Sequence, residues 1–283
     1  MNMLVKRKAV VQKAKDLRYK ETDVKYTTVE YPDLFVCKSC KKPIEKEELK
    51  SNHNLCPACG AHFYISPYDR LDLCFDQYER IEFSQHVDNP INFPGYADKK
   101  QLAKERSGLD EAIVIAKAKI KDLETYVFVM DKEFMMASMG IEVGERICRC
   151  FEMAQEEGLP VVGFCASGGA RMQEGIYSLM QMANTSFAIK DFSDAGGFFL
   201  AVLTNPTTGG VLASFASLAD MTIAEPFATI GFTGRRVIEQ TIKEKLADDF
   251  QTSEFQLAHG FLDEIVSRQD LHDYIEKALA YHR

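Results

Sequence analysis

The apolar residues of this chain follow two patterns along its length. Short unbroken apolar runs, which are typical of buried strands, occur at 112–120, 125–131, 159–165, 198–203, 220–226 and 227–232. Helical patterns occur at 68–76, 98–106, 143–158, 176–182, 237–246, 253–259 and 271–281. Because strands and helices alternate in the second half, the sequence predicts an α/β fold with βαβ layers and a parallel sheet.

Two of the predicted strands run into a glycine pair that precedes a helix. The strand 159–165 leads to Gly168–Gly169, and the strand 198–203, which we expect Thr204–Pro206 to end, leads to Gly209–Gly210. Glycines at the start of a helix leave backbone N–H groups open, and the helix dipole adds positive potential there. Since sites in parallel sheets form at the carboxyl ends of strands, both pairs are candidates to donate to one oxyanion. The alternative is that the glycines only let helix and strand pack closely.

Four cysteines near the N-terminus have the spacing of metal ligands. Cys37 and Cys40 form one C-x-x-C pair, Cys56 and Cys59 form another, and fifteen residues separate the pairs. This spacing predicts a zinc ribbon whose four thiolates close the coordination shell, so the zinc is expected to be structural. Two redox pairs are the alternative, which is disfavoured because so short a segment needs a metal in place of a core.

The other cysteines and two nearby histidines have no ligand spacing. We expect buried, reduced thiols at Cys74, Cys148, Cys150 and Cys165. We expect surface positions for His53 and His62, because four cysteines already suffice for a zinc ion.

Charge and length suggest three parts and exclude some classes of protein. The formal net charge of −8 argues against a chain that binds nucleic acid along its whole surface. Residues 1–30 nevertheless hold eight basic against four acidic residues, which predicts a flexible basic tail. We expect a zinc ribbon at 31–66 and one larger domain at 67–283. No apolar run reaches transmembrane length and no signal-peptide core is present, so we expect a soluble, cytoplasmic protein.

Three motifs carry a resemblance to a known family. They read A-S-G-G-A-R-M-Q-E-G at 166–175, L-T-N-P-T-T-G-G-V at 203–211 and I-G-F-T-G-R-R-V-I-E-Q-T at 230–241. With the cysteine cluster, the chain resembles the carboxyltransferase β subunits of bacterial acetyl-CoA carboxylase, from Cys37 to about residue 268. The resemblance implies a ClpP/crotonase-like core and an active site shared with an α subunit.

The resemblance also implies the reaction and its participants. The carboxyl group of carboxybiotin, held by the biotin carboxyl carrier protein, would pass to acetyl-CoA and give malonyl-CoA. The expected partners are the α subunit in an α2β2 assembly, the carrier protein and biotin carboxylase, with structural zinc as the bound metal. Such a transfer needs no protein base, because the biotin ureido nitrogen can take the proton, so Glu142, Glu145 and Glu174 are expected to be acids of helix first turns.

The resemblance implies a set of site residues. The backbone oxyanion donors would be Gly168, Gly169, Gly209 and Gly210. Substrate would be bound by Met139, Gly140, Arg171, Gly231, Arg235 and Arg236. The two last arginines could hold a CoA phosphate or a carboxylate, or instead pair with the partner subunit. Met172 and Met180, at helical spacing, are expected in the core.

This sequence departs from the family pattern at a few positions, and two other functions stay open. The departures are Ala137, Ile141, Leu212 and Thr233. A stand-alone crotonase-type hydratase or isomerase would need acid–base carboxylates near the second glycine pair, and 204–217 contains none. A regulator that contacts nucleic acid through the ribbon and the basic tail would be compatible with the first function.

Overall fold

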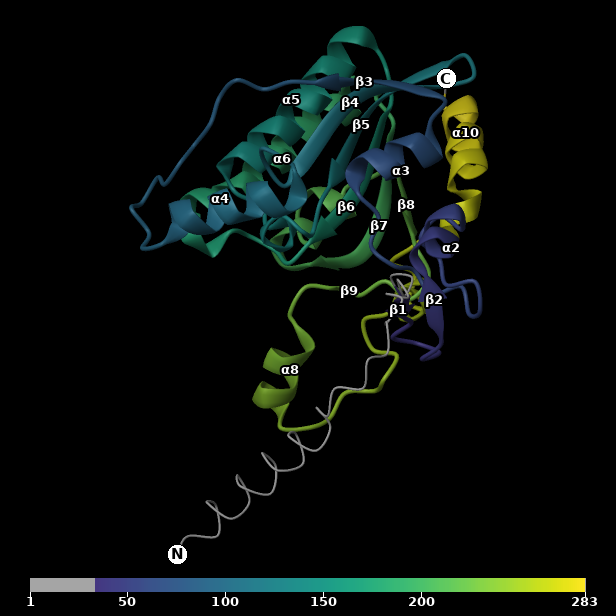
Figure 1. Ribbon diagram of the computed structural model, residues 1–283. Helices are drawn as coiled ribbons and strands as arrows, with labels where there is room; N and C mark the ends of the chain where they lie inside the picture. The colour runs from purple at the N-terminus through teal and green to yellow at the C-terminus, as the bar shows by residue number, and fades with distance from the viewer. Residues whose placement is uncertain (1–33, 283) are drawn as a thin grey trace, which may run out of the picture.

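A mixed sheet forms the centre of the computed structural model in Figure 1, with helices on both faces. The structure describes residues 34–282, so the predicted basic tail at 1–30 lies outside the described residues. Helices α5 and α6 cover one face of the sheet, and α3 and α10 cover the other (Figure 1). None of the helices within the described part is long and apolar enough to cross a membrane.

Eight strands of residues 34–282 make up this sheet, in the order β10-β8-β7-β6-β5-β4-β3 with β9 paired to β7. They are β3 (Gln77–Ile81), β4 (Ile113–Ile120), β5 (Leu123–Met130), β6 (Val161–Ser167), β7 (Phe199–Thr208), β8 (Met221–Ala224), β9 (Ile230–Gly231) and β10 (Glu264–Ile265). Strands β3, β4 and β5 run antiparallel. The pairs β5–β6, β6–β7, β7–β8, β8–β10 and β7–β9 are parallel, so the βαβ prediction is confirmed.

Helices join the strands close to where the sequence pattern predicts them. They are α2 (Lys46–Ser51), α3 (Pro67–Cys74), α4 (Tyr96–Ser107), α5 (Ile141–Glu157), α6 (Ile176–Asp194), α7 (Gly209–Leu212), α8 (Arg235–Ile242), α9 (Ser253–Ala258) and α10 (Leu271–Tyr281). Short 3₁₀ turns are η1 (Met135–Ala137), η2 (Met172–Glu174), η3 (Phe215–Ser217) and η4 (Arg268–Asp270). Helix α3 starts where expected because the Ser66 hydroxyl accepts the Asp69 N–H at 3.2 Å and proline follows the cap.

Strand β7 is longer than predicted. It continues through Thr204–Pro206 to Thr208, so the prediction that these residues end the strand is wrong. The Thr207 N–H donates to the Thr229 oxygen at 2.9 Å, so β9 supplies a backbone partner beyond the proline. The β6–β7 ladder shifts register between Cys165 and Ser167. Pro206 of β7 lies opposite this irregularity, where its missing N–H is tolerated. The strand expected at 227–232 is correspondingly reduced to β9.

The core is built around phenylalanine rings between the sheet and helices α5 and α6. Phe128 of β5 meets the rings of Phe151 and Phe199 at centroid distances of 6.3 and 6.0 Å. A Cβ on Gly163 would lie 2.1 Å from Cζ of Phe128, so β6 needs glycine there to pass beneath the ring. This packing fixes the position of β6 relative to Phe128, and β6 leads to the first glycine pair.

The four-cysteine segment has a small core of its own. Strands β1 (Leu34–Val36) and β2 (Pro43–Glu45) form an antiparallel pair, and α2 follows. Cys37, Ile44, Leu49 and Cys56 are buried together, apart from the large core. The remaining cysteines are unpaired: Cys74, Cys150 and Cys165 are buried and Cys148 is half-buried. Burial raises the pKa of Cys74 and of Cys148 to about 12, so both thiols stay protonated at neutral pH.

Candidate active site and metal centre

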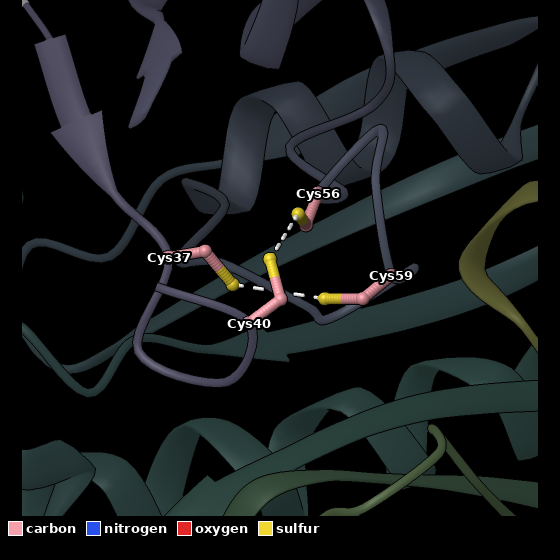
Figure 2. Close-up of side chains that lie close together, drawn as sticks. All are labelled: Cys37, Cys40, Cys56 and Cys59. Carbon is pink, nitrogen blue, oxygen red and sulfur yellow. Dashed lines mark hydrogen bonds between the residues drawn. The ribbon is translucent and has the colours of Figure 1, made fainter. Parts of the chain in front are cut away.

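The four predicted metal ligands point at one another from two facing turns (Figure 2). Their sulfur atoms all lie within 4.8 Å of one another. Cys37 Sγ is 3.7 Å from Cys59 Sγ, and Cys40 Sγ is 3.7 Å from Cys56 Sγ. A tetrahedral ion with Zn–S bonds of about 2.3 Å requires sulfur separations of about 3.8 Å. The cluster therefore has the dimensions of a four-thiolate metal site.

The chemistry of these thiols also suits a metal. A backbone hydrogen bond from Ala61 lowers the pKa of Cys59 to about 6, so this sulfur is largely thiolate at neutral pH. Burial raises the pKa of Cys56 to about 11, and a cation beside it would be needed to hold its thiolate form.

The two flanking histidines differ from expectation. His53 is exposed as predicted, but the side chain of His62 is only 9% exposed, so the surface prediction for His62 is wrong. Its Nδ1 lies 3.2 Å from Oε2 of Glu225, a buried carboxylate of the large domain. The sequence could not indicate this contact, because the two residues are far apart along the chain.

The two glycine pairs lie face to face at the carboxyl ends of β6 and β7. Gly209 has φ +63° and begins α7, and Gly169 has φ +113° just after β6. A Cβ on Gly209 would lie 2.9 Å from the Cα of Gly169, closer than real side chains allow. Glycine is thus required at Gly209 both by the left-handed φ and by the approach of the two backbones.

Three of the four predicted N–H donors already have protein acceptors. Gly168 N–H donates to the Met136 oxygen at 2.8 Å, Gly169 N–H to the Ser167 hydroxyl at 2.9 Å, and Gly209 N–H to the Phe232 oxygen at 3.1 Å. The prediction that all four glycines serve as open oxyanion donors is therefore wrong for these three. Their hydrogen bonds hold the turns in place instead.

Two neighbouring N–H groups, those of Gly210 and Ala170, have no protein acceptor within residues 34–282. Gly210 is the second residue of α7, where no acceptor exists inside the helix. Ala170 forms a parallel bridge to Met139, in which Met139 bonds only to Gly169 and Arg171. A Cβ built on Gly210 would lie 3.6 Å from the Ala170 nitrogen, so the two residues lie close together. The sequence reasoning missed Ala170, although it directly follows the first glycine pair.

The η1 segment, which has left-handed backbone angles, holds the turn after β6 in place. Met135, Met136 and Ala137 have φ values of 48°, 58° and 50°, which cost non-glycine residues roughly 1–2 kcal/mol each. The Met136 oxygen accepts the Gly168 N–H, and the Ala137 oxygen accepts the Ser167 hydroxyl at 2.7 Å. Ala137, one of the departures from the family pattern, therefore adopts a backbone conformation that glycine adopts without strain.

Arg171 is a structural residue, and its assignment to substrate is wrong. Its side chain is fully buried and its guanidinium bonds to both oxygens of Glu111, at 2.6 and 3.0 Å, and to the Ser138 oxygen at 2.8 Å. Burial alone would raise the pKa of Glu111, but the charge and hydrogen bonds of Arg171, together with the Lys100 charge and the Ala112 N–H, outweigh it and lower that pKa to about 2. Arg171 thereby ties the turn after β6 to the start of β4.

Three more predicted substrate contacts pack against protein. The Met139 side chain is fully buried. A Cβ on Gly140 would lie 2.5 Å from Oε1 of Glu174, and one on Gly231 would lie 2.3 Å from Nε2 of Gln251. Both glycines are therefore required for close packing, and contact of these three residues with substrate through their backbones stays a prediction.

Of the two arginines predicted to bind substrate, the structure describes the side chain of Arg235 but not that of Arg236. The Arg235 guanidinium donates to the backbone oxygens of Leu246, Ala247, Asp248 and Phe250 at 2.7–3.2 Å. It closes the loop after α8, so its donors are used within the chain and the prediction that it grips substrate is wrong. Arg236 belongs to α8, and its side chain lies outside the described residues.

Glu142 and Glu174 lie in first turns, of α5 and of η2, as expected. Glu174 caps α5 by accepting the Ile141 N–H at 2.6 Å. Glu142 accepts the Val87 N–H at 2.8 Å and pairs with Lys100, so both carboxylates are buried and have hydrogen-bond partners.

Met172 and Met180 are 72% and 51% exposed, so their assignment to the core is wrong. They belong to an apolar surface, which we call the α6 face, formed by Met172, Ile176, Leu179, Met180 and Phe187.

Comparisons with known proteins identify the family and the fold of this chain. A family model described as carboxyl transferase domain matches residues 78–278. The fold is similar to transcarboxylase 12S (TM-score 0.64, 24% identity, 76% of this chain and 40% of that chain). It is also similar to the Pseudomonas malonate decarboxylase MdcD–MdcE heterodimer (TM-score 0.59, 22% identity, 77% and 86%) and the P. aeruginosa geranyl-CoA carboxylase beta subunit (TM-score 0.59, 16% identity, 76% and 38%).

These similarities confirm the predicted crotonase-like α/β fold with an N-terminal four-cysteine cluster. The chain spans only 40% of the length of the transcarboxylase 12S chain. Because the family model matches most of its residues, this chain belongs to the carboxyl transferase domain family.

Proposed function

We propose that this chain is the β half of a carboxyltransferase that moves a carboxyl group from carboxybiotin to acetyl-CoA and yields malonyl-CoA. The observation that carries the proposal is the pair of open N–H groups, Ala170 and Gly210, at the carboxyl ends of β6 and β7. Membership of the carboxyl transferase family supports the reaction class. Acetyl-CoA as the acceptor rests on the motifs that resemble the β subunits of acetyl-CoA carboxylase.

The donor pair would stabilise the charge that the reaction develops. Loss of a proton from the acetyl methyl group turns the thioester oxygen into an enolate oxygen, and the enolate carbon then bonds to the transferred carboxyl carbon. Two backbone N–H groups fixed by surrounding hydrogen bonds favour that oxygen more as its charge grows. The bond between the carboxyl carbon and the biotin ureido nitrogen would break, and the freed nitrogen would take the proton, so this chain need supply no base.

The four cysteines would hold one structural zinc ion. Four thiolates leave no coordination position for substrate, so the ion would stabilise the ribbon and take no part in bond making. The sulfur separations of 3.7 Å support this assignment.

A partner subunit would complete the site. The α6 face supports this, since Phe187 and Ile176 are 70% and 62% exposed and such apolar surface is usually covered by another protein. The similar malonate decarboxylase structures are a hetero-dimer and a hetero-tetramer. We therefore propose an α subunit in an α2β2 assembly that acts in the cytoplasm with biotin carboxylase and the biotin carboxyl carrier protein.

The stand-alone hydratase or isomerase is less well supported. Such an enzyme needs a carboxylate that can exchange protons with the acyl chain. The carboxylates of Glu111, Glu142 and Glu174 are buried and bonded to cations or backbone N–H groups.

A reconstitution experiment tests the proposal. The chain would be mixed with a cognate α subunit, and decarboxylation of malonyl-CoA would be followed in the presence of free biotin. We expect activity from the mixture and none from either subunit alone. Hydration of an enoyl-CoA by this chain alone, or an inactive but stably formed complex, would contradict the proposal.

A further inference from the structure

Arg268 lies between the four-cysteine segment and the large domain. It belongs to η4 and is only 2% exposed. Its Nη1 donates to three backbone oxygens of the ribbon: His53 at 3.1 Å, Asn54 at 3.4 Å and Phe63 at 3.1 Å. Its Nε and Nη2 donate to the two oxygens of Glu225 at 3.0 and 3.1 Å. One guanidinium thus joins the ribbon backbone to one carboxylate of the domain.

The three ribbon oxygens come together only when the second cysteine turn is folded. Leu55 and His62 form a bridge, and the Phe63 N–H donates to the Asn54 oxygen at 2.9 Å. Between them, the Cys56 N–H donates to the Ala61 oxygen at 2.8 Å and closes the turn that carries Cys56 and Cys59. Because short cysteine turns fold only with their metal, loss of the ion should separate the acceptors of Arg268.

Glu225 connects this contact to the glycine turn. It follows β8, is buried, and its N–H donates to the Leu203 oxygen of β7 at 3.0 Å. The backbone oxygen of Glu225 accepts the Ala228 N–H at 3.3 Å, just before β9. Strand β9 pairs with Thr207–Thr208, and the next residue, Phe232, accepts the Gly209 N–H. The segment 225–232 therefore runs from the ribbon contact to the turn that carries Gly210.

We propose that Arg268 and Glu225 are positioning residues that transmit the metal-dependent folding of the ribbon to the Gly209–Gly210 turn. Unfolding of the ribbon would strip Arg268 of three acceptors, and a buried guanidinium left with free N–H groups turns toward water. Glu225 would then lose its bidentate partner, and the segment 225–232 would loosen. That this loosening impairs catalysis rests on the proposed function, whereas the coupling itself does not.

Arg70 provides a matched control within the same cluster. Its Nη1 also donates to Glu225, at 2.8 Å, and its side chain is equally buried. No hydrogen bond joins the Arg70 side chain to a ribbon oxygen in the part of the chain that the structure describes. Arg268→Lys and Arg70→Lys therefore disturb the same carboxylate, and both leave its contact with His62 of the ribbon in place, but only the first removes side-chain hydrogen bonds to the ribbon backbone oxygens.

Hydrogen exchange of single amides in the full-length chain tests the proposal, with zinc bound and after removal by a chelator. In wild type and in Arg70→Lys we expect the Gly209 and Thr207 amides to exchange about tenfold faster without zinc, which corresponds to about 1.4 kcal/mol. Amides of the β4–β5 ladder should not change. In Arg268→Lys the Gly209 amide should already exchange fast, and zinc removal should change it less than about twofold.

Several outcomes would overturn the coupling. The first is an exchange rate of the Gly209 amide that does not change when zinc is removed from wild type. The second is an acceleration of this exchange in Arg268→Lys as large as in wild type. The third is an equal acceleration of exchange in the β4–β5 ladder, which would mean global unfolding. Reconstituted enzyme gives a separate readout: Arg268→Lys should lower kcat about tenfold with KM little changed, while Arg70→Lys should not. If wild-type complex transfers no carboxyl group, the proposed function fails and the exchange result still decides the coupling.

Discussion

Replacement of Gly210 by alanine should separate catalysis from stability. Gly210 does not have a left-handed φ and lies inside α7, so alanine fits its backbone and gains up to about 1 kcal/mol of helix propensity. The new Cβ would lie 2.9 Å from Sδ of Met182 and 3.6 Å from the Ala170 nitrogen. The first contact is with a flexible thioether that can move aside. The second places a methyl group beside the open Ala170 donor.

The expected loss of activity follows from the geometry of the donors. An oxyanion must lie about 2.7–3.1 Å from each N–H nitrogen, and the Cβ of Gly210→Ala would take up part of that space. Loss of one such donor costs roughly a factor of 10²–10³ in kcat, or about 2.7–4 kcal/mol. The free energy of unfolding should stay within about 1 kcal/mol of wild type, because the helix gain offsets the displacement of Met182.

The assay is kcat of the reconstituted complex, measured together with the melting temperature of the variant chain. Gly209→Ala is the matched comparison, since its φ of +63° and the 2.9 Å approach to the Gly169 Cα should destabilise the fold. Normal kcat in a folded Gly210→Ala complex would refute the role of this donor. A lower melting temperature with unchanged kcat per folded molecule would return Gly210 to a packing role.

Further predictions concern the metal, acid stability and nucleic acid. Freshly purified reduced protein should contain about one zinc per chain by elemental analysis, and Cys37→Ser should lose it and melt at lower temperature; metal-free wild type would contradict the assignment. The pKa of Glu111 is lowered from 4.5 to about 2, so its ion pair with Arg171 stabilises the fold above pH 4.5 and loses this effect as the pH falls toward 2. Glu111→Gln should therefore destabilise the chain by about 3–5 kcal/mol at neutral pH and flatten the acid limb of a melting-temperature profile; an unchanged profile would show that the pair contributes little. If the ribbon and basic tail bind nucleic acid, labelled RNA should shift in a salt-sensitive way, and the absence of a shift at low salt would remove this function.

The sequence predicts features that depend on neighbouring residues. Alternating strands and helices, the two glycine pairs and the cysteine spacing are all local patterns, and the structure has each of them. The sequence could not predict hydrogen bonds between residues that are far apart along the chain. The N–H groups of Gly168 and Gly209 donate to no substrate oxygen, because they already donate to the backbone oxygens of Met136 and Phe232 from other segments.

Burial was the other source of error. Arg171 follows a glycine pair, as a substrate-binding residue would, but Glu111, from the segment just before β4, neutralises it in the interior. Met180 has helical spacing, yet periodicity gives only the apolar side of a helix and not what covers that side. Ala170 went unnoticed because an alanine carries no chemical signal in its side chain, and only the tertiary structure reveals an unused backbone donor.

The parallel pairing of β6 with β7 has a consequence for the order of folding. The hairpin of β4 and β5 is local and can form early, whereas β6 and β7 meet only after the whole of α6 has crossed between them. Ala170 and Gly210 lie beyond the ends of these two strands, so the donor pair arises only with this long-range contact. A partly folded or newly synthesised chain that holds the hairpin but lacks the β6–β7 pair therefore has no oxyanion site, and catalytic competence is among the last properties that folding confers.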